Sequence, residues 1–228
     1  LPRSEPKAYS ADNVGDVAKA LKTGKPSVIL MNGELTASRS AMADQISQAT
    51  GARILMDTFV PRVQRGAGRA EVARLPYFGE MAAEVLEGTK HLILLSSQPP
   101  VTFFAYPDKP NYLTPDGCDL HTLVERDEDI DGALEALVDA VGAGDVSPRL
   151  LPLEIPNLPS GELTQRSAGA TLAHFFPEDA IIVDEGGMNG GGSVAATRTG
   201  QPHDHLILTG GAIGFGLPCA TGAAVACP

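Results

Sequence analysis

Short apolar runs alternate with amphipathic stretches along the first part of the chain. A continuous apolar run is typical of a strand buried on both faces, whereas apolar positions that recur every three or four residues predict a helix. Strands that alternate with helices indicate an α/β fold, in which a parallel sheet carries helices on both faces in a Rossmann-like arrangement. The predicted strands are residues 27–31, 53–56, 91–96 and 119–123, and the predicted helices are residues 13–22, 36–50, 77–87 and 129–141.

Closely spaced prolines then interrupt this pattern between Ser147 and Gly161. Proline has no backbone N–H and excludes helix, so the density of prolines predicts an extended connector. We therefore expect a central domain at residues 1–146, a linker at 147–162 and a second, incomplete α/β domain at 163–228. In that last part the pattern predicts a helix at 164–176, a strand at 180–184, a glycine-rich loop, a strand at 205–208 and a helix after Pro218.

Composition and charge exclude several classes of protein. The net charge of -11 disfavours nucleic acid and anionic membranes as partners, because both carry negative phosphates. The three cysteines fit neither a disulfide framework nor a zinc-ligand spacing, which indicates a reducing cytosol and a cytoplasmic location. Residues 1–10 contain no apolar run of the kind found in signal peptides.

Residues 206–228 carry no charge and are numerous enough to cross a bilayer. Five glycines and Pro218 interrupt them, which favours packing against protein or ligand over a membrane span. The segment ends within an apolar pattern, so we expect the chain to be truncated. We also expect these residues to be poorly ordered or buried in a neighbouring chain.

Two glycine-rich segments are candidates for ligand binding. The first, DEGGMNGGGS at 184–193, follows a predicted strand, where open α/β sheets bind ligands, and its glycines would let backbone N–H groups approach a phosphate. It matches neither a P-loop nor the dinucleotide fingerprint, and a flexible surface loop is an equal alternative. The second, TGGAIGFGLP at 209–218, sets four glycines around Ile213, and a tight turn without a ligand is its alternative.

These segments resemble a known family. The run TGGAIGFGLPCATGAAVACP is similar to the segment that cradles the aminopyrimidine ring in thiamine-diphosphate-dependent enzymes of the acetolactate synthase and benzoylformate decarboxylase type. The preceding PEDAIIVDEGG resembles the strand and loop that open the same domain. Residues 163–228 match in order and spacing, whereas residues 1–146 resemble the family's central domain in layout, best at KPSVILMNGEL.

The resemblance implies a role for each matching residue. The Gly211 carbonyl would accept a hydrogen bond from the cofactor's 4′-amino group, and the Ile213 N–H would donate to a pyrimidine nitrogen. The Ile213 side chain would lie between the two rings and hold the cofactor bent, which orients an intramolecular base. Gly210 and Ala212 complete this cofactor-binding turn. The residues implied at the diphosphate end are Glu185, Gly186, Gly187, Met188 and Asn189.

Two parts of the family pattern are absent from this sequence. The family binds magnesium through a Gly-Asp-Gly motif and a later Asn, which would follow Pro228. The pyrimidine-binding domain, whose Glu activates the cofactor from a partner subunit, is also absent. We therefore expect no catalytic residue and no metal ligand in this chain, and no activity from it alone.

The resemblance implies a transferase or lyase that makes or breaks a carbon–carbon bond of a small 2-oxo acid with thiamine diphosphate and magnesium. An acetolactate synthase-like reaction is the first choice, and a 2-oxo acid or oxalyl-CoA-type decarboxylase is the alternative. The intact protein would be a homodimer or homotetramer. An FAD- or NAD-binding domain without thiamine chemistry is a second alternative, and a structural subunit is a third.

Acetolactate synthases hold FAD against the central domain, and Gly33, Arg39 and the arginines of PRVQRGAGRAEVAR are the candidate contacts. Glu34 would place a carboxylate near the flavin diphosphate, which disfavours FAD. The same arginines could clamp a phosphate or form a solvated loop, and the loop is favoured. His203-Asp204-His205 could hold a metal, but the sequence offers no third ligand nearby.

Overall fold

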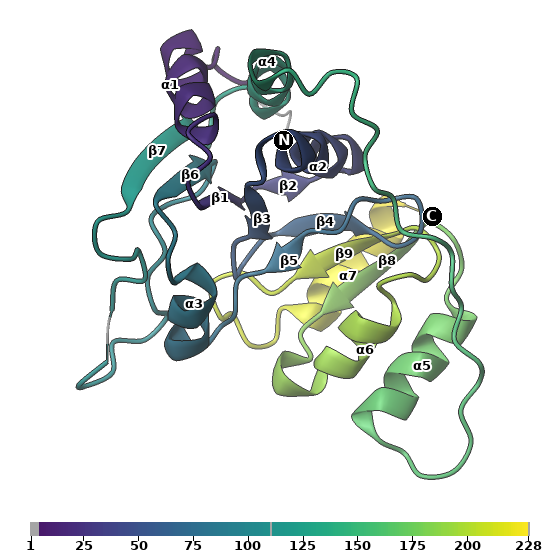
Figure 1. Cartoon of the computed structure of the whole chain (residues 1–228). Coiled ribbons are helices and arrows are strands. Elements are labelled where there is room, and N and C mark those ends of the chain that lie inside the picture. The colour runs from purple at the N-terminus through teal and green to yellow at the C-terminus, as the bar shows by residue number, and fades with distance from the viewer. Residues whose placement is uncertain (1–4, 110, 228) are drawn as a thin grey trace. The chain divides into compact units, whose positions relative to one another are not determined.

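The computed structural model describes residues 5–109 and 111–227, apart from the side chain of Met188 (Figure 1). These residues form two units. The first unit comprises Leu1–Gly33, Ala41–Thr58 and Val72–Pro148, and the second comprises Glu34–Ser40, Phe59–Glu71 and Arg149–Pro228. The second unit thus includes two segments that precede the predicted linker, and the domain boundaries at 147–162 stay a prediction about the whole protein.

The first unit is built on a parallel sheet with the strand order β5-β3-β1-β6-β7. Every residue of β1 and β6 is buried, which explains why both strands are continuous apolar runs. The predicted parallel sheet is confirmed. Its strands are β1 (Ser27–Met31), β3 (Arg53–Met56), β5 (Ala73–Arg74), β6 (His91–Leu95) and β7 (Asp119–Val124).

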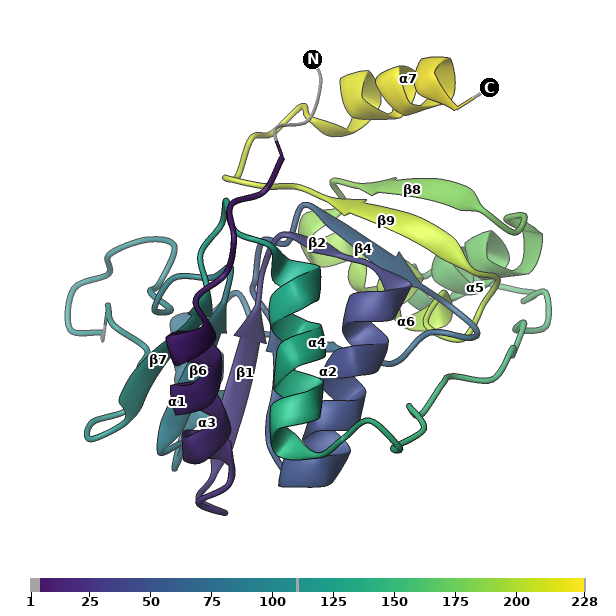
Figure 2. The same cartoon turned by 90° about the horizontal axis from the view of Figure 1, so that it is seen from above.

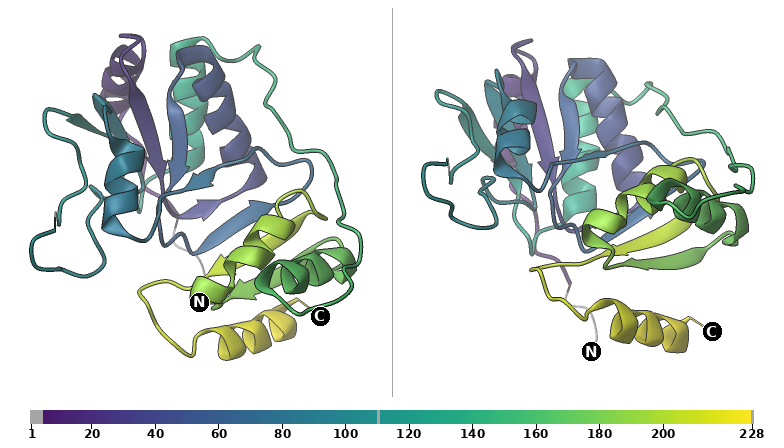
Figure 3. Two further views of the ribbon diagram at one scale, coloured as in Figure 1. Left: turned by 60° about the horizontal axis from the view of Figure 1, so that its bottom comes forward. Right: turned by 90° about the horizontal axis from the view of Figure 1, so that it is seen from below.

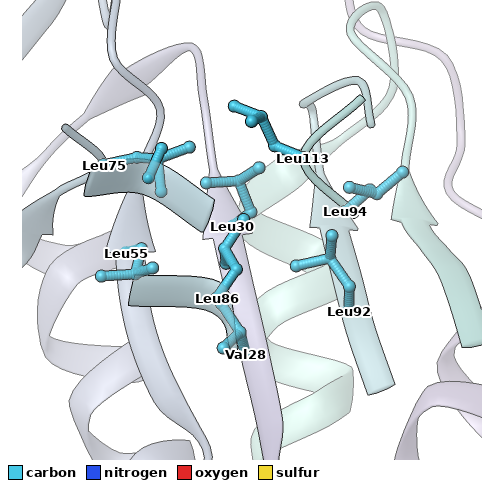
Figure 4. Packing of buried hydrophobic residues seen from close by; sticks show 9 residues of the cluster. Val28, Leu30, Leu55, Leu75, Leu86, Leu92, Leu94 and Leu113 are labelled. Carbon is cyan, nitrogen blue, oxygen red and sulfur yellow. The ribbon is translucent and has the colours of Figure 1, made fainter. Parts of the chain in front are cut away.

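Helices cover both faces of this sheet, as predicted. On one face lie α1 (Ala11–Leu21), α4 (Ile130–Val141) and the part of α2 (Ala37–Thr50) that belongs to this unit, and α3 (Gly79–Leu86) lies on the other (Figures 1 and 2). Successive strand residues point to opposite faces, so alternate positions of β1 and β6 pack toward α3. Figure 4 shows this cluster, which contains Val28, Leu30, Leu55, Leu75, Leu86, Leu92, Leu94 and Leu113.

The second unit contains a mixed sheet with the order β2-β4-β9-β8. Strand β9 (His203–Ile207) pairs parallel to β8 (Ala180–Asp184) and antiparallel to β4 (Arg62–Arg65), which in turn pairs with β2 (Glu34–Leu35). The sequence favours a solvated loop for the arginine stretch. This prediction is wrong at residues 62–65, which form a strand through main-chain pairing with β9. Arg62 in this strand also forms a two-pronged ion pair with Asp204, at 2.9 and 3.0 Å.

Helices lie on both sides of this second sheet. α5 (Gln165–Phe175), the short η1 (Gly187–Asn189) and α6 (Gly191–Ala196) follow one another along the chain. α5 and α6 lie on one side, and α7 (Gly216–Ala226) lies on the other (Figure 3). None of the helices within 5–109 and 111–227 combines the length and the apolar character that a membrane span requires.

α5 and α6 approach each other through two glycines. A Cβ built on Gly169 would clash with the carbonyl group of Gly192 and would lie 2.7 Å from the Ser193 nitrogen. Since no such contact is tolerated, any side chain at Gly169 must push α6 away from α5.

We expect Gly169→Ala to lower the free energy of unfolding by about 1–3 kcal/mol, because overpacking outweighs the higher helix propensity of alanine. Gly222 is the matched control: it also lies within a helix, and nothing lies within 4 Å of a Cβ placed there. Gly222→Ala should instead stabilise by about 0.5–1 kcal/mol. Urea unfolding measures both, and equal effects of the two substitutions would show that the α5–α6 contact is looser than described.

Candidate functional site

The two glycine-rich segments leave the second sheet at the same edge. β8 and β9 are parallel neighbours, and Asp184 at the end of β8 is in register with Ile207 at the end of β9. The loop after β8 and the turn after β9 therefore start side by side. The structure brings together the two segments that the sequence singles out.

A carboxylate links them directly. The Glu185 side chain accepts hydrogen bonds from the backbone N–H groups of Gly214 and Gly216. These two bonds, the one from Gly214 first, hold the pKa of Glu185 below its usual value, because both favour the ionised form. The turn thus stabilises the ionised form of the Glu185 carboxylate that it contacts.

The turn itself is open to solvent. Gly210, Gly211 and Gly214 have φ values of 64°, 66° and 93°, which L side chains rarely adopt. Nothing lies within 4 Å of a Cβ placed on Gly210, and the Ile213 side chain is 94% exposed. The Ile213 side chain therefore projects from the turn, and the turn has room beside it for a ring.

Within the turn, the Ile213 N–H donates to the Gly211 carbonyl at 2.9 Å, and the Phe215 N–H donates to the Ala212 carbonyl at 3.1 Å. The two backbone groups that the resemblance assigns to the pyrimidine thus bind each other here. The Gly211 oxygen keeps a second lone pair for another donor. The Ile213 N–H would have to change partner to reach a pyrimidine nitrogen.

Residues 206–227 form regular structure for most of their length. Ile207 is buried at the end of β9, and α7 has no buried residue. The apolar side chains of α7 lie in solvent, with Leu217 81% and Val225 78% exposed. The expectation of disorder or burial in a neighbouring chain concerns an assembly, and it stays a prediction.

The loop after β8 is held by its own hydrogen bonds. The Asp184 Oδ1 atom accepts from the Gly186 N–H at 2.8 Å, and the Asn189 side-chain oxygen accepts from Gln165 at 3.0 Å. A cavity of about 270 Å³ opens beside this loop. Its lining includes Glu185, Gly186, Asn189, Gly190, Ser193 and His205.

A charged network supports the loop from within the second unit. Buried His205 lies 3.0 Å from the Arg65 guanidinium through Nδ1 and 3.2 Å from Asp184 Oδ2 through Nε2. Because the guanidinium only donates, Nδ1 accepts and Nε2 carries the proton that is donated to Asp184. Arg65 also donates to the Val194 carbonyl of α6 at 3.0 Å. In the sequence, only the polar side chains of RVQR and HDH pointed to a network of this kind.

The His203-Asp204-His205 segment does not form a metal site by itself. Asp204 is paired with Arg62, both His205 nitrogens have partners, and the rings of His203 and His205 are 6.3 Å apart. Within the described ranges, no group of three or more His, Cys, Asp or Glu side chains is arranged to hold a metal ion.

The first unit has a switch point between β1 and β6, where nucleotides bind in many α/β folds. The nearby Asp57 carboxylate accepts from Asn32 and from Ser97, both at 3.0 Å, and from the Thr58 N–H at 2.7 Å. A negative charge here disfavours a diphosphate. The two remaining candidate contacts for a flavin belong to different units, Gly33 to the first and Arg39 to the second. The Arg39 side chain donates a hydrogen bond to the Glu34 carbonyl at 2.8 Å.

Known proteins resemble this chain in sequence and in fold. No family model matches the chain. Over 217 residues, 95% of its length, the chain is 46% identical to the "Putative acetolactate synthase large subunit IlvX" of Mycobacterium tuberculosis, and it covers 42% of that protein.

Two solved structures share the fold. A "putative thiamin diphosphate-dependent enzyme" from Mycobacterium smegmatis matches 99% of the chain with a TM-score of 0.66 and 19% identity. The thiamine diphosphate-dependent 4-hydroxybenzoylformate decarboxylase of Rhodococcus jostii RHA1 matches 100% of it with a TM-score of 0.69 and 19% identity. The chain covers 47% and 46% of these two proteins, so it spans less than half the length of each relative.

Proposed function

We propose that this chain, a relative of the thiamine-diphosphate-dependent enzymes of the acetolactate synthase type, contributes part of the cofactor site to an enzyme acting on 2-oxo acids. That enzyme would make or break the carbon–carbon bond next to the carbonyl. The observation that carries the proposal is the open turn at residues 210–213, which presents a backbone carbonyl and an apolar side chain to solvent.

Each part of the turn has a distinct task in this proposal. The Gly211 carbonyl and the Ile213 N–H, once the latter has changed partner, would bind the aminopyrimidine, and Gly210 and Ala212 would shape the backbone around them. The exposed Ile213 side chain would lie between the two rings of the cofactor and would orient them for proton transfer. When bound, thiamine diphosphate supplies an electron sink for decarboxylation.

The loop after β8 would line the diphosphate end through Glu185, Gly186, Gly187, Met188 and Asn189. A carboxylate beside a diphosphate is unfavourable, but both Glu185 oxygens are directed to the Gly214 and Gly216 N–H groups, so we expect Glu185 to border the diphosphate end without contacting the phosphates. We expect the magnesium ligands and the activating Glu to come from parts of the enzyme outside this sequence. We also expect a homodimer or homotetramer in which a partner subunit completes the site.

The reaction that we favour is acetolactate synthase-like carboligation, in line with the name of the Mycobacterium tuberculosis relative. Decarboxylation of a 2-oxo acid is the second candidate, and the Rhodococcus jostii structure, a decarboxylase, supports it. A product assay on the full-length protein separates the two. Carboligation joins two 2-oxo acids with release of one CO2, whereas decarboxylation leaves an aldehyde.

Calorimetry of the full-length protein with thiamine diphosphate and magnesium tests the proposal. We expect saturable heat at one cofactor per chain, and weaker binding of thiamine without its diphosphate, because the loop after β8 would then lose its ligand. Absence of heat in both titrations contradicts the proposal. A flavin absorbance that copurifies with the protein would instead favour the nucleotide-binding alternative.

A further inference from the structure

We propose that Glu185 is a positioning residue, whose carboxylate fixes the turn at 210–216 in the shape that presents Gly211 and Ile213. The carboxylate acts on the turn through the Gly214 and Gly216 N–H groups. The effect of Glu185 on cofactor binding rests on the proposed function. The effect of its carboxylate on the conformation of the turn does not.

The contact is specific in its geometry. Each carboxylate oxygen accepts from a different N–H, Oε1 from Gly214 and Oε2 from Gly216, so the side chain bridges the turn on either side of Phe215. Both N–H groups lie about thirty positions after Glu185, with separations of 29 and 31. A bridge of this kind restrains the rotation of the peptide units between its two ends.

The bridge also caps α7. The first N–H groups of a helix have no partner within the helix, and the side chain before α7, Phe215, cannot accept a hydrogen bond. Glu185 takes the place of a local cap, and its negative charge is favourable at the positive end of the helix. A Cβ on Gly216 would lie 2.7 Å from Glu185 Oε2, so a side chain at this position would require the carboxylate to shift.

Apart from the bridge, the turn has short-range backbone hydrogen bonds from Ile213 to Gly211 and from Phe215 to Ala212. Ile213 is 94% exposed and no residue of α7 is buried, so side-chain packing contributes little to its shape. Loss of the carboxylate should therefore free the turn and leave the sheet of this unit intact. A residue that only supported the fold would, when removed, loosen the sheet as well.

Amide NMR and hydrogen exchange on this chain test the action on the turn. Because the two bonds favour the ionised carboxylate, the Gly214 and Gly216 amide shifts should titrate with a midpoint below that of an ordinary Glu. In Glu185→Ala we expect amides of residues 214–216 to exchange about tenfold faster, while β8 and β9 amides keep their rates.

Glu178→Ala is the matched control, because Glu178 is an exposed carboxylate just before β8. It should leave the exchange of residues 214–216 unchanged. Unchanged exchange in Glu185→Ala, or equal acceleration throughout β8 and β9, overturns the proposal. The first result would show that the bridge does not hold the turn, and the second that Glu185 only supports the fold.

Calorimetry on the full-length protein tests the consequence for the cofactor. At fixed magnesium, the dissociation constant for thiamine diphosphate should rise about tenfold in Glu185→Ala. It should rise less in Glu185→Gln, whose single carbonyl oxygen retains one of the two bonds. Equal affinity of Glu185→Ala and the unsubstituted protein overturns the cofactor role. If the unsubstituted protein binds no thiamine diphosphate, the proposed function fails, and the exchange data alone decide whether Glu185 fixes the turn.

Discussion

Replacing Ile213 with Ala in the full-length protein should lower turnover by about 100-fold, because a cofactor that is no longer held bent presents its amino group in the wrong place. The same substitution should change the free energy of unfolding by no more than about 0.5 kcal/mol, since the side chain is 94% exposed and packs against little. Steady-state kinetics at saturating cofactor and urea unfolding measure the two effects.

Leu217→Ala is a suitable comparison, because Leu217 is also exposed and apolar but lies in α7, outside the residues assigned to the cofactor. We expect it to leave turnover within about twofold of the unsubstituted protein, as is usual for a surface position. A parallel loss of turnover and stability in Ile213→Ala would identify Ile213 as a packing residue of the intact enzyme and remove its role between the rings.

The second unit should lose stability in acid because of His203. Burial, together with smaller effects of nearby Arg65 and His205, lowers the pKa of His203 to about 4, although a hydrogen bond to the Gln201 carbonyl acts to raise it. The folded form thus keeps His203 neutral, whereas the unfolded chain takes up a proton as the pH falls through 6.5. We expect the free energy of unfolding to fall by about 3 kcal/mol between pH 7 and pH 4, and to change little from this source above pH 7.

His203→Gln replaces the titrating imidazole with a neutral side chain of similar size. The free energy of unfolding should then depend less on pH, even if the substitution lowers it at pH 7. His91 in the first unit will leave a residual slope, because burial and the neighbouring His121 lower its pKa too. Chemical unfolding at several pH values measures these slopes, and an unaltered slope in His203→Gln would show that another group controls acid sensitivity.

The first sheet was predictable because burial on both faces leaves a direct mark on the sequence. The runs SVILM and HLILL match β1 and β6 within one residue. The strands that were missed, β2, β4 and β5, have two to four residues each and gain their stability from main-chain pairing, so their side chains carry no apolar pattern. Helix α6 was hidden for a related reason, since its glycines read as loop but permit the close contact with α5.

The candidate site was predictable in part. The glycine pattern and the resemblance located the two segments, but the bond from Glu185 to the turn depends on the register of β8 against β9, which local sequence does not encode. The partnership of Arg65 with His205 was hidden for the same reason, because it joins strands 140 residues apart.

The pairing of β4 with β9 has a practical consequence for anyone who divides this polypeptide. A cut within the proline stretch appears natural from the sequence, yet it would leave β9 in one piece and its neighbour β4 in the other. Each piece would then carry a bare strand edge, which recruits strands from other molecules and promotes aggregation. Residues 59–71 must therefore accompany the carboxyl-terminal half if that half is to avoid aggregation through its bare strand edge.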